Sequence, residues 1–186
     1  MELRHPFEWN SLSAQKRAFW VLFVVTIIVM ASMQVIDTLL KSELAPSGIL
    51  SFEFAGDLST AQKMTESWGG RGRIAAGFSL GLDYLFLLTY AGSIGMGCVL
   101  VTRSVSKRTK QLYNIGIMLA WALLLAALLD AVENYALIRV LLGSNLAFWP
   151  KVAAWCAAPK FVIVAAGLAY ILIGVVVSMF SRRRTE

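Results

Sequence analysis

Four long apolar segments dominate this chain of 186 residues, at about 18–40, 74–102, 112–142 and 151–180. Each exceeds the roughly 20 residues that an α-helix needs to cross the hydrocarbon of a bilayer. Only 15% of the residues are charged, whereas about a quarter of a typical soluble domain is charged. The sequence therefore predicts an all-α fold, a bundle of four transmembrane helices in one membrane domain over residues 1–186.

The first apolar segment follows Lys16 and Arg17, so a cleaved signal peptide is the rival interpretation. Its apolar run extends from Ala18 to Ile36. That run is longer than the hydrophobic core of a typical signal peptide, and no clean cleavage site follows it. We therefore expect an uncleaved membrane anchor.

Positive residues divide unevenly between the predicted connections. Ten lie in the 1–17 arm, the 103–111 loop and the 181–186 tail, and five lie in the 41–73 loop and at the end of the 143–150 turn. The ten are Arg4, Lys16, Arg17, Arg103, Lys107, Arg108, Lys110, Arg182, Arg183 and Arg184, and the five are Lys41, Lys63, Arg71, Arg73 and Lys151. Because positive residues concentrate on the cytoplasmic side, we expect both termini in the cytoplasm of a bacterium and the spans in its inner (plasma) membrane.

The predicted outer loop, 41–73, has structural signals of its own. Pro46 to Gly48 is a turn signal, and residues 49–54 are consistent with a short extended piece. Asp57 or Ser59 can then begin a helix that Gly69-Gly70 ends. Ala61, Met64 and Trp68 share one face of that helix. We expect a short amphipathic helix that lies on the membrane surface or caps the bundle, either as a packed lid or as a gate.

Small residues recur along the second segment. Gly77 and Gly81 form a GxxxG pattern, and Ser93 with Gly97 forms a second pattern of the same spacing. Such spacing lets two helix backbones approach closely. It predicts packing between helices, since neither pattern follows a strand as a nucleotide-binding loop would.

Ionisable residues inside the spans are the main functional candidates, because charges in hydrocarbon are costly and normally face a partner or a polar pocket. Asp83, Glu133 and Lys160 each lie nine residues from the predicted outer end of their segment, roughly 13 Å by helical rise. Asp130 lies roughly 18 Å from that end. Asp130, Glu133 and Asn134 follow the i, i+3, i+4 spacing of one helix face. These five residues are the candidates for a ligand-binding or ion-binding site.

Secondary candidates flank this group. They are Tyr84, adjacent to Asp83, Arg73, just before the second segment, and Asp37, which is also spaced to pair with Lys41 one turn on. Arg139 lies about half a turn around the helix from Asp130, so we expect it at the interface. Pro159 removes a backbone donor beside Lys160 and predicts a kink in the fourth helix.

The polar group has two interpretations from sequence. Buried ion pairs can hold helices in register without any further function. However, Asp83, Asp130 and Glu133 outnumber Lys160, so a proton, a cation or the basic group of a ligand is needed to neutralise the remainder. Carboxyls without histidine suit a hard cation such as Ca²⁺ or Mg²⁺, although the identity of any metal stays open.

Other classes of site and partner are not expected. The one histidine, His5, lies outside the spans, and the two cysteines occupy different spans, so neither zinc nor haem is predicted and no cofactor is assigned. The net charge of +6 lies beside the hydrophobic spans, which argues against nucleic acid as a partner.

Three stretches carry a resemblance to a known family. They are Ser51-Phe52-Glu53-Phe54-Ala55-Gly56, Leu82-Asp83-Tyr84-Leu85-Phe86 and Asp130-Ala131-Val132-Glu133-Asn134. Together they resemble an uncharacterised bacterial family of small four-helix integral membrane proteins, over most of residues 51–134. The resemblance implies a four-span bundle and brings no activity with it.

Three functions remain open from the sequence. The first is a non-enzymatic protein that binds a lipid or small ligand, or a subunit of a larger membrane complex. The second is an ion- or proton-coupled transporter in which Asp83, Asp130 or Glu133 titrates and Lys160 is the counterion. The third is an intramembrane enzyme that uses Asp130 and Glu133 for acid–base work on a lipid-like substrate. Expected partners are membrane lipids and either further copies of the chain or a larger complex.

Overall fold

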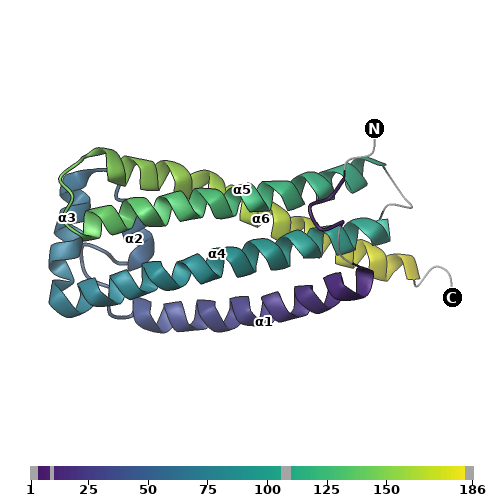
Figure 1. The fold of residues 1–186 in the computed structure, drawn as a ribbon, viewed down its shortest axis with the longest axis horizontal. Coiled ribbons are helices and arrows are strands. Elements are labelled where there is room, and N and C mark those ends of the chain that lie inside the picture. Colours follow the sequence, from purple (N-terminus) through teal and green to yellow (C-terminus); the bar gives the residue numbers. More distant parts are fainter. Residues whose placement is uncertain (1–3, 9–10, 106–109, 183–186) are drawn as a thin grey trace. The chain divides into compact units, whose positions relative to one another are not determined.

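The computed structural model describes residues 4–8, 11–105 and 110–182, and all regular elements in these ranges are helices (Figure 1). The helices are α1 (Leu12–Asp37), α2 (Ile49–Glu53), α3 (Leu58–Ser67), α4 (Gly69–Val105), α5 (Lys110–Leu141) and α6 (Phe148–Arg182). The all-α fold with four long helices and a structured loop is confirmed. Lys107, Arg108, Arg183 and Arg184, which carry part of the orientation prediction, lie outside the described residues.

The four long helices are long and apolar enough to cross a membrane, with mean hydropathies between 1.8 and 2.6 over their most apolar stretches. Only 6% of that stretch is buried in α1. Its Trp20, Val21 and Val24 side chains are all more than half exposed. Apolar side chains on such a helix are compatible with lipid as the surrounding solvent. The chain is accordingly a multi-pass membrane protein.

Helix boundaries differ from the predicted ones by a few residues. Helix α1 begins at Leu12, and the Ser11 hydroxyl accepts a hydrogen bond from the Ala14 N–H at 3.3 Å. This satisfies one of the amide donors that a helix start leaves without a partner. Helix α3 ends at Ser67, and helix α4 begins two residues later at Gly69. Gly69 and Gly70, which are predicted to end the loop helix, are therefore also the first residues of the second span. Apolar patterning alone misses such polar first turns.

The contacts along the chain divide into two compact units. The first unit comprises Met1–Val25, Thr89–Ala127 and Phe161–Glu186, and the second comprises Thr26–Leu88 and Leu128–Lys160. A single membrane domain over the whole chain stays a prediction.

The first unit is built around neutral contacts. Phe7, Met96, Val99 and Ala120 form a buried apolar cluster. Gly97 is close to neighbouring side chains, because a Cβ added there would lie 2.7 Å from Ile171 and 3.2 Å from Phe19. Side chains therefore pack against Gly97, and a close approach of two helix backbones at the second small-residue pattern stays a prediction.

The first small-residue pattern, in the second unit, behaves differently. A Cβ added at Gly77 would meet only Leu141, at 3.6 Å, and one added at Gly81 would meet no described atom within 4 Å. The prediction of close helix packing at Gly81 is wrong for contacts within this chain. A GxxxG spacing permits close approach without requiring a helix to lie against that face.

The second unit has a larger apolar core that α2 and α3 help to close. The Phe52 and Trp68 rings pack edge to face, with centroids 5.3 Å apart. The Trp68 Nε1–H donates to the Leu40 carbonyl at 2.6 Å. Asp57 is the N-cap of α3, since its carboxylate accepts from the Thr60 N–H at 2.9 Å. The predicted amphipathic helix is confirmed, and its apolar face packs on the core of this unit.

The extended piece predicted at 49–54 is wrong, because Ile49–Glu53 is the helix α2. Gly48 has a φ of +57°, which turns the chain into the helix and suits a residue without a Cβ. The Asp37 carboxylate accepts a hydrogen bond from the first amide of α2, that of Ile49, at 2.7 Å. This turn carries the buried Phe52 into the core and directs the next residue, Glu53, toward the polar residues described below.

Candidate functional site

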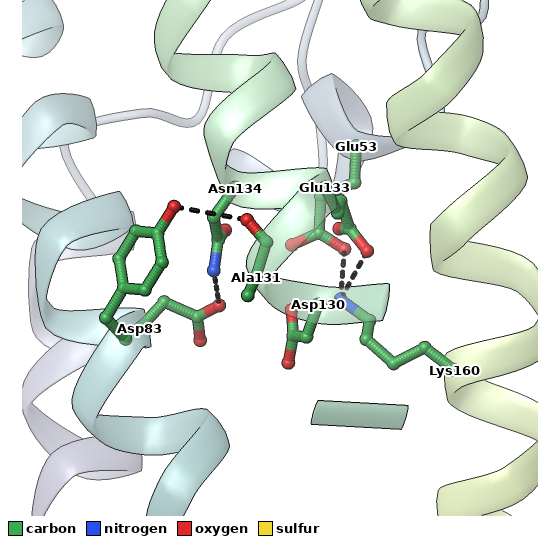
Figure 2. A network of polar contacts seen from close by, with 8 residues as sticks. Glu53, Asp83, Asp130, Ala131, Glu133, Asn134 and Lys160 are labelled. Carbon is green, nitrogen blue, oxygen red and sulfur yellow. Dashed lines mark hydrogen bonds and ion pairs between the residues drawn. The ribbon is translucent and has the colours of Figure 1, made fainter. Parts of the chain in front are cut away.

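A buried lysine lies at the middle of the candidate site in the second unit. Lys160 projects from α6 and is 6% exposed. Its Nζ is 2.8 Å from Glu133 Oε2 and 3.0 Å from Asp130 Oδ1. A third carboxyl oxygen, Glu53 Oε2, lies 3.7 Å away (Figure 2). One ammonium thus forms ion pairs with three carboxyls from two helices.

Helix α5 supplies two of these carboxyls because of their spacing. Asp130 and Glu133 are three residues apart, so they lie on the same face, one turn from each other. Asp130 is 2% exposed and Glu133 is fully buried. The structure therefore brings together three of the five predicted site residues, Asp130, Glu133 and Lys160, in direct contact.

The other two predicted residues form a neighbouring pair. The Asn134 side-chain amide donates a hydrogen bond to Asp83 Oδ2, from α5 to α4 (Figure 2). Asn134 is 1% exposed and Asp83 is 7% exposed. Asn134 adjoins Glu133 in sequence, so this pair continues the polar contacts across α5. Glu53, Asp83, Asp130, Glu133, Asn134 and Lys160 together are called the polar centre.

Glu53 is the site residue that the sequence analysis missed. It was placed in the loop, where charged residues are normally solvated, yet its side chain is only 13% exposed. The available signal is its position between two phenylalanines, Phe52 and Phe54. Burial raises the pKa of Glu53, and the nearby Lys160 ammonium opposes this shift.

The secondary candidates have structural contacts. Asp37 accepts the Ile49 N–H at the start of α2, as described above. Arg73 donates to the Leu141 carbonyl at the end of α5, at 2.9 Å. The Tyr84 hydroxyl donates to the Ala131 carbonyl at 3.1 Å. Each contact joins two segments of the second unit.

The predictions for two residues near the polar centre, Arg139 and Pro159, can also be compared with the structure. Arg139 does not pair with Asp130, and its guanidinium lies 5.8 Å from the centroid of the Trp149 ring. Helix α6 continues through Pro159, which precedes Lys160.

The polar centre has more acid than base. It contains four carboxyls, those of Glu53, Asp83, Asp130 and Glu133, and a single ammonium. In addition, Glu133 Oε1 is buried without a hydrogen-bond donor among the described residues. Uncompensated charge in so dry an environment is strongly unfavourable. The excess carboxyls therefore require protons or a cation to neutralise them.

A metal ion is not the favoured cation. Among the described residues, no three of Asp, Glu, His and Cys are grouped so as to hold one. The Lys160 ammonium already occupies the space between the Asp130 and Glu133 carboxyls. The hypothesis of a Ca²⁺ or Mg²⁺ site therefore gains no support from the geometry.

Comparisons with protein-family models, with curated proteins and with solved structures found no match to this chain. The resemblance to small four-helix bacterial membrane proteins consequently stays a prediction.

Proposed function

We propose that the protein is a proton-coupled membrane carrier in which the polar centre takes up and releases protons. The observation that carries this proposal is the excess of carboxyls over the Lys160 ammonium in a buried site. Protons are the smallest species that can neutralise the excess, and they need no additional space. Proton-binding carboxyls within membrane spans are the usual elements of proton relays.

A purely structural ion-pair network explains less of the arrangement. One carboxyl is enough to neutralise Lys160, and further buried acids only add desolvation cost. Glu133 Oε1, buried with no donor to it, would be especially unfavourable as part of an ionised carboxylate. Glu53 and Glu133 both lie against the Lys160 ammonium, so a proton on one of these carboxyls reduces the negative charge that Lys160 must neutralise. This arrangement favours exchangeable protons over a fixed lock.

We also propose a location and an orientation, namely the bacterial inner membrane with both termini in the cytoplasm. The excess of Lys and Arg in the arm, the 103–111 loop and the tail supports this orientation. The polar centre then lies in the outer leaflet, and α2 and α3 face the outside. Labelling of a cysteine introduced at the exposed Ser47 by a membrane-impermeant thiol reagent in intact spheroplasts tests it. Absence of labelling before lysis, with labelling after it, would contradict the orientation.

The proton content of the site can be measured directly by infrared spectroscopy. Protonated carboxyls have a C=O stretching band that carboxylates lack, and a pH step in the reconstituted protein should change its intensity. We expect Glu133→Gln and Asp130→Asn to reduce this change. Glu66→Gln is the matched control, since Glu66 is an exposed glutamate of α3 in the same unit. An unchanged band in both site variants would refute proton storage.

Coupling to movement requires a second measurement. Proteoliposomes that contain a pH-sensitive dye should acidify when a potassium diffusion potential is imposed, and the rate should fall in Glu133→Gln and Asp130→Asn. Protein that stores protons but leaves the vesicle pH unchanged would exclude proton movement without a co-transported solute and retain only proton binding. Equal rates for wild type and both variants would overturn the coupling.

A second candidate function is supported by a different observation. The most apolar stretch of α1 is only 6% buried, which offers a large surface to lipid or to another membrane protein. We therefore keep a lipid-binding or small-ligand-binding role, or membership of a larger membrane complex, as the alternative. Mild solubilisation followed by native mass spectrometry tests it. Recovery of a lipid-free monomer would argue against this candidate.

A further inference from the structure

The first unit contains a cavity of about 320 Å³ that the proposed carrier function does not use. It lies between the N-terminal segment, α4 and α5, and its polar lining comes from His5, Glu8, Thr102, Arg103 and Tyr113. Val99 and Ile117 make an apolar part of the wall. This volume falls at the lower end of the range of about 300–1,000 Å³ that is typical of small-molecule sites.

Two nitrogen donors face each other at the wall of this cavity. The Nδ1 atom of His5 accepts a hydrogen bond from the Phe7 N–H at 3.2 Å. A neutral imidazole has one proton, so this proton must be on Nε2. His5 Nε2 lies 3.4 Å from Arg103 Nη2, and a guanidinium nitrogen can only donate. The contact therefore places an N–H of histidine next to an N–H of arginine.

The surroundings of His5 disfavour its charged form. Burial and the positive charge of Arg103 both lower the pKa of His5 from its ordinary value of 6.5, against a smaller opposing effect of Glu8. Protonation would only add a second donor, so Nε2 donates in either state. An oxygen with several lone pairs is the group that can accept from both nitrogens together.

The N-terminal segment that carries His5 is held in place by buried contacts. Phe7 is 8% exposed and belongs to the apolar cluster with Met96 and Val99. The Gln15 side-chain amide donates to the Phe7 carbonyl at 2.8 Å. The Trp121 Nε1–H donates to the Arg4 carbonyl at 3.0 Å. His5 is thus positioned over Arg103 by three independent contacts of its own segment.

We propose that this cavity binds the phosphate group of an anionic ligand, with Arg103 and His5 as its donors. The guanidinium of Arg103 matches the geometry of a phosphate oxygen pair, and His5 Nε2–H adds a third donor. Val99 and Ile117 accommodate an apolar portion next to the phosphate. A phospholipid headgroup and free phosphate share this recognition chemistry, and binding measurements distinguish them.

Glu8 sets a limit on the affinity of this site. Its carboxylate lines the same cavity and opposes an anion, although Arg4 lies 3.8 Å away and offsets part of its charge. Removal of the Glu8 charge should consequently strengthen anion binding. A gain in affinity is a useful test, because a misfolded variant cannot produce it.

The experiment uses the full chain in detergent, with two probes. Titration calorimetry measures inorganic phosphate, and native mass spectrometry measures retention of phosphatidylglycerol against uncharged diacylglycerol. Arg103→Gln should weaken binding about tenfold or more, as expected for loss of a charge-assisted contact. Glu8→Gln should strengthen binding severalfold. Lys110→Gln removes an equal charge from an exposed residue of the same unit and should change binding less than about twofold.

The outcomes distinguish free phosphate from a lipid headgroup as the ligand, and the remaining ones would overturn the proposal. Saturable binding of phosphate with the expected order of variants assigns free phosphate as the ligand. The same order with phosphatidylglycerol alone assigns a lipid headgroup. Equal weakening by Arg103→Gln and Lys110→Gln would overturn the proposal, because it indicates nonspecific attraction. Equal retention of diacylglycerol, or no saturable binding of either phosphate probe, would overturn it as well.

Discussion

Glycines of the first unit such as Gly97 and Gly116 lie close to neutral side chains, whereas the second unit surrounds a lysine with carboxyls. In the first unit a Cβ added at Gly116 would lie 2.0 Å from Thr102 Oγ1 and 2.5 Å from the Tyr170 hydroxyl. In the second unit Lys160 Nζ lies within 4 Å of three carboxyls. The first unit should therefore be sensitive to added volume and the second to changes of charge.

The largest expected effect is the loss of the buried ammonium. Lys160→Met has a similar length but no charge, so it leaves four largely buried carboxyls without a counterion. Breaking a buried ion pair in this way costs about 3–5 kcal/mol of stability. Unfolding in detergent, followed by circular dichroism, measures the change. Lys151→Met, at the exposed start of α6, is the control, and an equal loss there would contradict the assigned role of Lys160.

The matching test in the first unit adds volume without charge. Gly116→Ala places a methyl group against the Thr102 and Tyr170 hydroxyls, which are 3.0 Å apart and hydrogen-bonded. Overpacking of this kind costs about 1–3 kcal/mol. Gly81→Ala is the control from the second unit, since a Cβ there meets nothing within 4 Å. The same unfolding measurement should show no loss, or a small gain from helix propensity, for Gly81→Ala. A larger loss of stability in Gly81→Ala than in Gly116→Ala would contradict the prediction that the first unit is the more sensitive to added volume.

Some features of the fold and of the polar centre can be predicted from the sequence. Segment length and hydropathy predict the four long helices, and the i, i+3, i+4 spacing predicts a common face for Asp130, Glu133 and Asn134. Helical rise also predicts that Asp83, Glu133 and Lys160 lie at one depth, which by itself does not establish contact. These features are local or follow from helical rise alone. They required no knowledge of side-chain contacts.

The contribution of Glu53 could not be predicted in this way. It depends on the positive φ of Gly48 and on a hydrogen bond from Ile49 to Asp37, twelve residues earlier in the chain. A turn of this kind is not determined by the periodicity of the loop, so residues 49–54 were expected to be extended. Likewise, Gly81 has the spacing of a packing motif but no described atom against it, because contact depends on the position of other helices.

A smaller and pH-dependent effect is expected at Glu53. Burial raises its pKa above the ordinary value of 4.5, so the folded state holds this proton more tightly than the unfolded chain. The resulting stabilisation is complete below that value and is lost as the pH rises through the raised pKa. Stability of the wild type should thus fall as the pH rises above 4.5, and more steeply than in Glu53→Gln.

The groups that face Glu53 are Lys160, Glu133 and Asp130, and all three remain in the Glu53→Gln variant. The difference between the two pH profiles therefore reports on Glu53 itself. Unfolding at a series of pH values provides the measurement. Glu43→Gln, an exposed glutamate of the same loop, should follow the wild-type profile. Parallel profiles for wild type and Glu53→Gln would contradict the role of burial.

The smallest effect is expected for substitution of Asp57. Its comparison with Glu53 tests whether the effect of an acidic residue on the stability of the second unit depends on burial. Asp57 is fully exposed, and hydrogen bonds from Thr60 lower its pKa. Its stabilising effect is therefore present above its ordinary pKa of 3.8 and is lost as the pH falls, opposite to Glu53. Asp57→Ala should speed hydrogen exchange only in the first turn of α3, at amides such as that of Thr60. Faster exchange throughout α2 and α3 would mean that this exposed cap, as well as the Phe52–Trp68 contact, holds both helices on the core of the unit.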